Sequence, residues 1–373
     1  MIYIIYKVLF FLPITDQLVS KQNERMIFIM ITSFAGKHLI TLQEWSRQEI
    51  DTCLDTAFDL KLKFARKIPH ASLRDETVFM MFFDESTRTR NSTEAGATQL
   101  GAHAHFLDAS KMQIQHGDSA KDTAMILSSY GHAIACRHCG WEVGNKYIRE
   151  MAKYSRVPVL NLQCDLYHPM QGLADLMTIQ EYFGRTGTKG LKVSVVWCYA
   201  TTHKKPISVP LTQTLLFPRY GMDVTLAYPE GYELPDWVIA KARENAEKHG
   251  GSVKITHNIR EAFEGADVVI PKNWGSWYGD SKKNLNAENR EGNTTLTEEE
   301  LKRLAANKSW KCTQELMDLT SANSIYMHAL PADRVNEVED SVIDGPHSAI
   351  YPEAENRLHT VKAVMDLTMG GRS

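Results

Sequence analysis

The feature that most constrains the fold of this chain is an alternation, from residue 37 onward, between short β-rich apolar runs and longer stretches of helical period. Apolar runs separated by helical stretches are typical of parallel sheets that helices cover on both faces. The pattern therefore predicts an α/β fold with two doubly wound parallel sheets, one in each half of the chain. The expected strands are 77–83, 104–107, 133–137 and 157–162 in the first half, and 192–197, 223–228, 252–256, 267–271 and 324–328 in the second.

The length of 373 residues also predicts two domains. Pro169 suits the first turn of a helix, and residues 170–183 have helical period, so we expect a helix at 169–183 that joins the domains. The first domain is expected at 31–168 and the second at 184–351. In the first half, further helices are expected near 45–65, 92–101, 119–131 and 145–154.

Charge and cysteine content narrow the function classes. The net charge is -3, so nothing favours nucleic acid or an anionic membrane as a partner. Six scattered cysteines favour a reducing compartment, which we take to be the cytoplasm. Residues 1–14 are apolar but interrupted by Lys7 and too short to span a bilayer. They are either a weak signal peptide or part of an extension that ends near Met26 or Met30, and we leave residues 1–30 out of the fold prediction.

The first motif with chemical meaning lies directly after the strand expected at 77–83. Hydroxyl and guanidinium side chains gather there at the start of a helix, where unpaired backbone N–H groups and the positive end of the helix dipole favour an anion. The motif therefore predicts a phosphate site; an ordinary capped helix with a solvated basic turn is the alternative. Its residues are Ser86, Thr87, Arg88, Thr89 and Arg90.

Two further motifs lie where the predicted domains meet. His168 and Gln171 flank Pro169 in the first turn of the joining helix, where a histidine can donate to a carbonyl oxygen and a glutamine amide can bind an NH2 group. The alternative is a capping histidine and a surface glutamine. Residues 327–334 are the end of the last expected strand and the proline turn that follows it, where backbone carbonyls would be free to accept from a ligand NH2 group. An ordinary turn without a binding role would account for these residues nearly as well.

Taken together and in this order, the three motifs resemble those of the aspartate/ornithine carbamoyltransferase superfamily, over nearly the whole chain from about Gly36. The resemblance implies transfer of a carbamoyl group from carbamoyl phosphate to the amino group of an ornithine-like or other amino-acid-like acceptor, without metal or organic cofactor. It implies that Thr89, Arg137 and His168 are the catalytic residues, because they donate to the carbonyl oxygen. The implied contacts to carbamoyl phosphate are Ser86, Thr87, Arg88, Thr89, Gln113, Arg137, His168, Gln171, Leu330 and Arg357.

The resemblance also implies the assembly. Residues 31–168, completed by a C-terminal helix at 352–370, would bind carbamoyl phosphate, and residues 184–351 would bind the acceptor. The catalytic unit would be a homotrimer in which the loop at 110–119 reaches the site of a neighbouring subunit. Gln113 stands where ornithine-type members carry a histidine, and His116 lies near the position of a lysine in aspartate-type members, so either side chain could serve.

The sequence departs from ordinary ornithine enzymes on the acceptor side. Ala329 and Lys272 stand where those enzymes carry a cysteine and an aspartate. A cation in place of an anion repels an ammonium group and attracts a carboxylate or carbonyl, which disfavours plain L-ornithine in the usual pose; alternatively, Lys272 points to solvent. The expected acceptor-binding residues are Lys272, Trp274, Ala329 and Leu330.

Residues 197–210 resemble the knotted branch of the superfamily, which includes acetylornithine and succinylornithine enzymes and YgeW-type proteins. A trefoil-type knot in the second domain is thus implied by resemblance alone. Three alternatives stay open: a carbamoyl-phosphate-binding protein without transfer activity, a catabolic enzyme that cleaves a ureido compound with phosphate, and a metal or redox role for Cys136 and Cys139. The polar stretch at 280–297 is expected to be a surface loop or lid.

Overall fold

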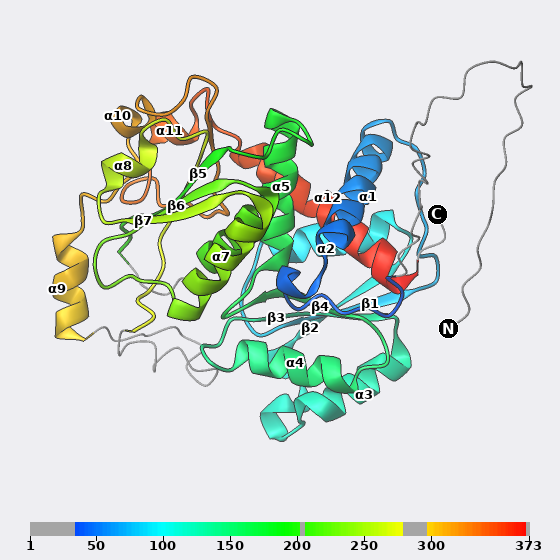
Figure 1. Ribbon diagram of the computed structural model, residues 1–373. Helices are drawn as coiled ribbons and strands as arrows, with labels where there is room; N and C mark the ends of the chain where they lie inside the picture. The colour runs from blue at the N-terminus through cyan, green and yellow to red at the C-terminus, as the bar shows by residue number, and fades with distance from the viewer. Residues whose placement is uncertain (1–33, 202–205, 279–296, 371–373) are drawn as a thin grey trace, which may run out of the picture. The chain divides into compact units, whose positions relative to one another are not determined.

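The computed structural model describes residues 34–201, 206–278 and 297–370. Within these ranges the chain forms two parallel sheets, each flanked by helices (Figure 1). This arrangement confirms the predicted α/β class with two doubly wound sheets. The parts of the predictions that concern residues 1–33, 202–205 and 279–296 lie outside the described residues; they include the N-terminal extension, most of the expected lid, and part of the stretch 197–210 whose resemblance implied a knot.

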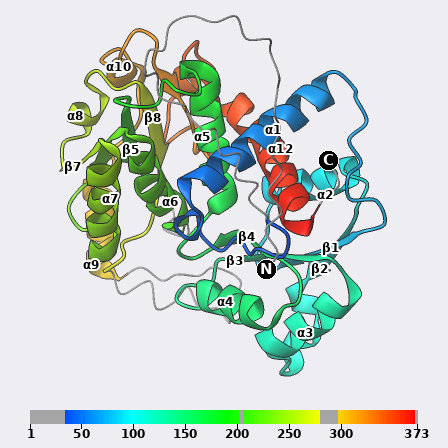
Figure 2. The ribbon, with the colours of Figure 1, turned by 45° about the vertical axis from the view of Figure 1, so that its right-hand side comes forward.

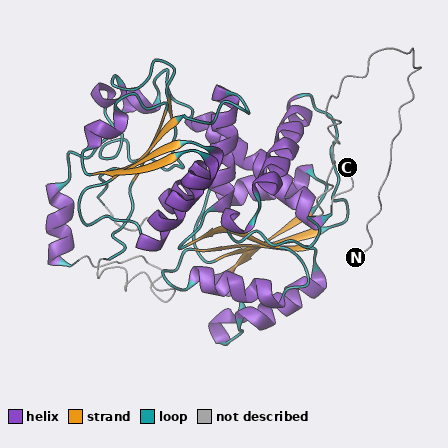
Figure 3. Cartoon of the chain, in the orientation of Figure 1, coloured by secondary structure: helices purple, strands orange, loops and turns teal. Residues whose placement is uncertain are grey.

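The first sheet has the strand order β2-β1-β3-β4, with all neighbours parallel. Helices α3 and α4 lie on one face of this sheet, and α1, α2 and α12 lie on the other (Figures 1 and 3). Its strands are β1 (Thr77–Phe82), β2 (His103–Asp108), β3 (Ala133–His138) and β4 (Val159–Cys164), and its helices are α1 (Arg47–Ala65), α2 (Arg88–Gln99), α3 (Ala120–Tyr130) and α4 (Gly144–Tyr154).

The second sheet has the order β7-β6-β5-β8-β9, again parallel throughout. Its strands are β5 (Lys192–Trp197), β6 (Asp223–Ala227), β7 (Ser252–Thr256), β8 (Val268–Lys272) and β9 (Ile325–Tyr326). The helices of this half are α6 (Ser208–Leu216), α7 (Asp236–His249), α8 (Ile259–Phe263), α9 (Glu298–Ala306), α10 (Gln314–Met317) and α11 (Asp340–Ile343). Short 3-10 turns complete the described chain: η1 (Leu42–Glu44), η2 (Ala109–Lys111), η3 (Gln113–His116) and η4 (Phe217–Tyr220).

Two long helices lie side by side between the sheets (Figures 1 and 2): α5 (Pro169–Phe183) and α12 (Ile350–Met369). Residues 169–180 of α5 are all buried, as expected of a helix that is covered on every side. Helix α12 packs against α5, α1 and α2, so the end of the chain lies beside the helix that follows β1. The packing places residues 350–369 next to residues 88–99, although more than two hundred residues separate them in sequence.

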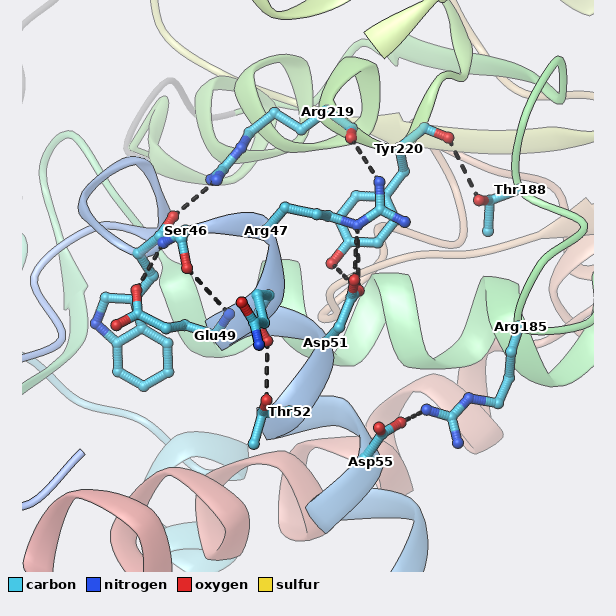
Figure 4. A network of polar contacts seen from close by, with 12 residues as sticks. Ser46, Arg47, Glu49, Asp51, Thr52, Asp55, Arg185, Thr188, Arg219 and Tyr220 are labelled. Atoms are coloured by element: carbon cyan, nitrogen blue, oxygen red, sulfur yellow. Dashed lines mark hydrogen bonds and ion pairs between the residues drawn. The ribbon is translucent and has the colours of Figure 1, made fainter. Parts of the chain in front are cut away.

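Polar contacts fix the start of α1 to η4 in the second half of the chain (Figure 4). Arg47 donates to the backbone carbonyl of Arg219 at 2.9 Å, and the Tyr220 hydroxyl donates to Asp51 at 2.8 Å. The guanidinium of Arg219 donates hydrogen bonds to the backbone carbonyls of Leu42 and Trp45. Since hydrogen bonds of charged groups are stronger than neutral ones, this network links the start of the described chain to η4 of the second half.

One boundary differs from the sequence prediction in a way that bears on function. Helix α2 begins at Arg88 rather than near residue 92. Its first turn is rich in threonine, serine and asparagine, which are weak helix formers, but Gly96 lets α2 approach Lys362 and Val361 of α12 closely. Tertiary packing thus extends the helix to the phosphate motif. Every helix in the described ranges is too short or too polar to cross a bilayer.

Candidate functional site

A pocket of about 440 Å³ opens between the two sheets at the start of α2. Its walls come from segments far apart in sequence: the loop after β1, the ends of β3, β4 and β8, the start of α5, the segment after β9, and α12. These are carboxyl ends of parallel strands, where ligands of open α/β sheets bind. The lining residues named from the sequence are Ser86, Thr87, Arg88, Thr89, Arg137, His168, Lys272, Ala329, Leu330 and Arg357.

The loop that carries Ser86 and Thr87 ends directly in the first turn of α2. Thr87 is the N-cap residue, yet its side chain makes no capping hydrogen bond. The side-chain cap of the alternative is thus absent at Thr87, and the first backbone N–H groups of α2 keep their capacity to bind an anion.

Three guanidinium groups from three different elements converge on this pocket: Arg88 of α2, Arg137 of β3 and Arg357 of α12. Burial and the charge of Arg137 lower the pKa of Arg88. Burial is also the main cause that lowers the pKa of Arg357 to about 10, although Asp175 opposes it. In addition, the Nε atoms of Arg137 and Arg357 have no hydrogen-bond partner among the described residues. Like charges held together with unused donors form a site for an anion.

Contacts within the protein hold two of these arginines in place. Arg137 donates to the side-chain oxygen of Gln163, which stands opposite it on the neighbouring strand β4. Gln163 in turn donates to the Ser208 hydroxyl at 2.9 Å. Arg357 donates to Thr89 at 2.9 Å and to the side-chain oxygen of Gln171 at 2.5 Å. The guanidinium groups are therefore positioned before a ligand arrives.

His168 lies at the start of α5 and is buried. Burial, followed by the charges of Arg357, Arg137 and Arg88, holds the pKa of His168 well below its usual range. The ring is therefore neutral at physiological pH, and its Nδ1 has no hydrogen-bond partner among the described residues. A neutral imidazole on a pocket wall can donate one N–H to a ligand oxygen without adding a further positive charge.

Gln171 is held by two buried carboxyl groups. Its Nε2 donates to Asp175 and to Glu353, each at 2.7 Å, while its Oε1 accepts from Arg357. Burial and the charge of Asp175 raise the pKa of Glu353 well above its ordinary value, and burial raises the pKa of Asp175 as well. The two carboxyl groups also share a hydrogen bond, which requires a proton. The charges of its neighbours thus fix the orientation of the Gln171 amide: its NH2 faces the carboxyl pair and its oxygen faces Arg357.

The acceptor side of the pocket is formed by Lys272, Ala329 and Leu330. Lys272 is only 6% exposed, so the alternative in which it points to solvent is wrong. Its place at the end of β8 puts a cation inside the pocket rather than on the surface.

Three of the contacts implied by the resemblance are not among the residues that line this pocket, and neither are Arg90 of the phosphate motif and His116. Gln113 is exposed in η3. The side-chain oxygen of Gln171 accepts from Arg357, which does line the pocket. Trp274 has a fully buried ring whose Nε1 donates to the carbonyl of Tyr232 at 2.9 Å, so its placement in the acceptor site is corrected to the core.

The lining also includes residues that sequence reasoning did not name as site residues: Glu85, Gln163, Pro206, Val209 and Pro331. Gln163 carried a usable signal, because it ends a strand that pairs in parallel with the strand of Arg137. Among the described residues, no group of three or more His, Cys, Asp or Glu side chains is placed to hold a metal ion.

Comparison with known proteins identifies the family. The model of the aspartate/ornithine carbamoyltransferase carbamoyl-P binding domain matches residues 37–181, and that of the Asp/Orn binding domain matches residues 205–368. The chain is 37% identical over 342 residues to the anabolic ornithine carbamoyltransferase of Pyrococcus furiosus, covering 92% of this chain and 99% of that protein. It is 35% identical over 351 residues to the YgeW protein of Escherichia coli strain K12, covering 88% and 89%.

Solved structures agree with this result. The ornithine carbamoyltransferase of Pyrococcus furiosus superimposes with a TM-score of 0.79 at 36% identity, covering 92% of this chain and 100% of that chain. An acetylornithine transcarbamylase complexed with acetylcitrulline superimposes with a TM-score of 0.77 at 32% identity, covering 88% and 98%. The chain belongs to the aspartate/ornithine carbamoyltransferase family of transferases.

Proposed function

We propose that this enzyme transfers the carbamoyl group of carbamoyl phosphate to the amino group of an amino-acid-like acceptor and releases phosphate. The observation that carries the proposal is the convergence of Arg88, Arg137 and Arg357 at the start of α2, beside the neutral ring of His168. A related N-acetyl-L-ornithine transcarbamylase variant has been solved with carbamyl phosphate bound, which supports the same ligand here.

The proposed roles follow from the charges that the reaction creates. The first turn of α2, with Ser86, Thr87 and Arg88, binds the phosphate group. The acceptor nitrogen attacks the carbonyl carbon, and negative charge develops on the carbonyl oxygen before phosphate leaves. Donors at the position of that oxygen stabilise the transition state more than the bound substrate. We assign this role to Thr89, Arg137 and His168.

The carbamoyl NH2 group requires acceptors instead of donors. The carbonyl of Leu330 lies on the pocket wall. The side-chain oxygen of Gln171 is held toward Arg357 and retains a second lone pair. We therefore assign orientation of the NH2 group to these two oxygens, with Arg357 between them and the phosphate site. Alignment of two bound substrates can contribute about 7–11 kcal/mol to catalysis, so no protein nucleophile or cofactor is needed.

For the acceptor, we propose an amino acid or related amine that presents a carboxylate or carbonyl oxygen, rather than an ammonium group, to Lys272. A buried lysine attracts the first two and repels the third. The small side chain of Ala329 leaves room beside it. The related acetylornithine transcarbamylase was solved with acetylcitrulline, in which an amide replaces the α-ammonium group, and this supports the proposal.

A substrate panel tests the function and the acceptor together. Purified enzyme with carbamoyl phosphate is offered ornithine, N-acylornithines, aspartate, diamines, diaminopropionate and oxamate, while phosphate release and the ureido product are measured. We expect transfer to an acceptor with an anionic or carbonyl group. Phosphate release with none of them, although carbamoyl phosphate binds, would instead favour a binding protein.

Lys272→Asp is expected to shift acceptor preference toward cationic amines, because it restores the charge that attracts an ammonium group. The ratio of kcat/KM for a diamine to kcat/KM for the anionic acceptor should rise by about tenfold or more. Lys308→Asp, an exposed lysine elsewhere in the same half of the chain, is the control and should leave the ratio unchanged. An unchanged ratio in Lys272→Asp would place Lys272 outside the acceptor site.

We further propose that the catalytic unit is a homotrimer in which Gln113 of one subunit reaches the site of the next. Its exposed position in η3, outside the pocket of its own chain, supports this assignment. We also propose that the enzyme works in the cytoplasm, since all six cysteines are unpaired.

A further inference from the structure

The acceptor wall of the pocket is built from two short segments. One is the end of β8, which carries Lys272 into the pocket and continues with Asn273. The other is residues 329–331, which follow β9. Leu330 there has a φ of +50°, a left-handed conformation that leucine rarely adopts. Such a conformation persists only where surrounding contacts hold it.

Glu337 and His328 lie together behind this wall, and both side chains are fully buried. The Oε1 atom of Glu337 accepts from the backbone N–H of Asn273 at 2.6 Å, and its Oε2 atom accepts from that of Asp333 at 3.1 Å. The Nε2 atom of His328 lies 3.2 Å from Oε1. One carboxylate thus contacts the chain directly after Lys272 and on both sides of residues 329–331.

The ring of His328 is fixed in one tautomer. Its Nδ1 accepts from the backbone N–H of Leu330 at 2.8 Å, so this nitrogen carries no proton. The ring proton must then be on Nε2, the atom that faces Glu337. Nε2 faces Oε1 of Glu337 at 3.2 Å without the alignment of a hydrogen bond, so the carboxylate acts on the ring through its charge, while Nδ1 of His328 bonds the backbone of Leu330.

We propose that Glu337 is a positioning residue that fixes the acceptor half of the pocket through His328 and the backbone of Asn273. Neither Glu337 nor His328 is among the pocket-lining residues, so both act through other groups. The phosphate half is held by other side chains, by Gln163 on Arg137 and by Gln171 on Arg357. The expected effect on the acceptor KM rests on the proposed function, whereas the expected effect on backbone amide exchange does not.

Glu337→Gln is the informative variant, because its amide offers one acceptor oxygen and turns an NH2 group toward groups that are themselves donors. Backbone amide exchange should become about tenfold faster or more at Asn273, Leu330 and Asp333, without change at residues 86–92. The dissociation constant of carbamoyl phosphate should rise less than the acceptor KM, because carbamoyl phosphate loses only its contact to the Leu330 carbonyl and keeps those to the arginines. With the best acceptor of the panel, KM should rise by about tenfold or more while kcat falls less.

Glu339→Gln is the matched control. Glu339 is two residues away and accepts from the backbone of Gln314, on the side remote from the acceptor wall. It should leave amide exchange at Asn273 and Leu330 and the acceptor KM unchanged. Glu337→Asp keeps the charge with a shorter reach and should give an intermediate acceptor KM.

The outcomes separate this inference from the proposed function. If wild type fails to bind carbamoyl phosphate, the function is wrong, and the exchange rates still decide whether Glu337 holds the two segments. If wild type binds carbamoyl phosphate but Glu337→Gln exchanges like wild type, or loses carbamoyl phosphate as strongly as acceptor, the inference is overturned. Should Glu337→Gln not fold, His328→Gln leaves the carboxylate and its two backbone donors in place and tests the same link to Leu330.

Discussion

Glu353 connects the two halves of the pocket through a single buried carboxyl group. One of its oxygens accepts from Gln171, and the other accepts from the backbone N–H of His328 at 2.7 Å. Asp175 lies beside it and accepts from Gln213 at 2.7 Å. Two carboxyl groups without solvent cannot both ionise at little cost, so the pair keeps a proton that exposed acids would lose.

The raised pKa of Glu353 has a direct consequence for stability. Its ordinary value is 4.5, and the folded value lies well above it, so the folded state binds more protons than the unfolded state over the interval between them. The free energy of unfolding should therefore fall as pH rises through that interval, by at most about 1.4 kcal/mol per pH unit from this group. Glu353→Gln removes this contribution.

The stability difference between wild type and Glu353→Gln is expected to move in favour of the variant as pH rises above the ordinary glutamate value of 4.5. Urea denaturation at several pH values measures it. Glu355→Gln, an exposed glutamate on the same helix, serves as the control and should keep the pH dependence of wild type. A difference between wild type and Glu353→Gln that stays constant with pH would mean that the carboxyl pair holds no extra proton.

At the scale of single residues, the sequence placed Lys272 in the acceptor site, and Lys272 does line the pocket. It placed Trp274, two positions further on, in the same site, and Trp274 lies in the core instead. In a strand, residues two apart share a face, which would put both in the pocket. Strand β8 ends at Lys272, however, so the alternation of side chains between the two faces does not continue to Trp274. Trp274 then turns into the core, where its ring donates to Tyr232 and its carbonyl accepts from Trp197.

At the scale of elements, the spacing of apolar residues predicted the strands well and the starts of helices less well. Strand β5 and strand β7 match the expected residues, because short runs between turn signals leave little freedom. The start of α2 was missed by four residues, since its polar first turn has weak helix formers and α2 packs against α12. Sequence period cannot report a contact with a helix more than two hundred residues away.

The short element η3 contains Gln113, which we propose to reach the active site of a neighbouring subunit. Arg88→Ala and Gln113→Ala should each be inactive as homotrimers, since each lacks one group of every site. Equal amounts that are dissociated and reassembled together should regain activity, because about one quarter of the sites then receive both intact side chains. Transfer to the best acceptor of the panel measures the recovery. No recovery, with normal activity in Gln113→Ala alone, would place Gln113 outside the reaction.

For the whole molecule, the decisive event is the meeting of α5 and α12 between the sheets. It brings Arg357, Gln171 and Thr89 into one set of hydrogen bonds. Nothing in the local sequence of Arg357 predicts that neighbourhood; only the likeness to a known family suggested it. The parallel sheets themselves were predictable, because their buried strands are encoded locally by apolar runs.

The central claim of this account is that a small, doubly charged ester binds where the guanidinium groups converge. Calorimetric titration of carbamoyl phosphate into wild type, Arg88→Ala and Arg137→Ala tests it most directly, with Arg90→Ala as the control, since Arg90 is exposed and stacks on Phe106. We predict saturable binding in wild type and Arg90→Ala, and no measurable binding in the other two variants, because each loses charged hydrogen bonds of about 1.5–3 kcal/mol apiece. Unchanged binding in both Arg88→Ala and Arg137→Ala would contradict the account.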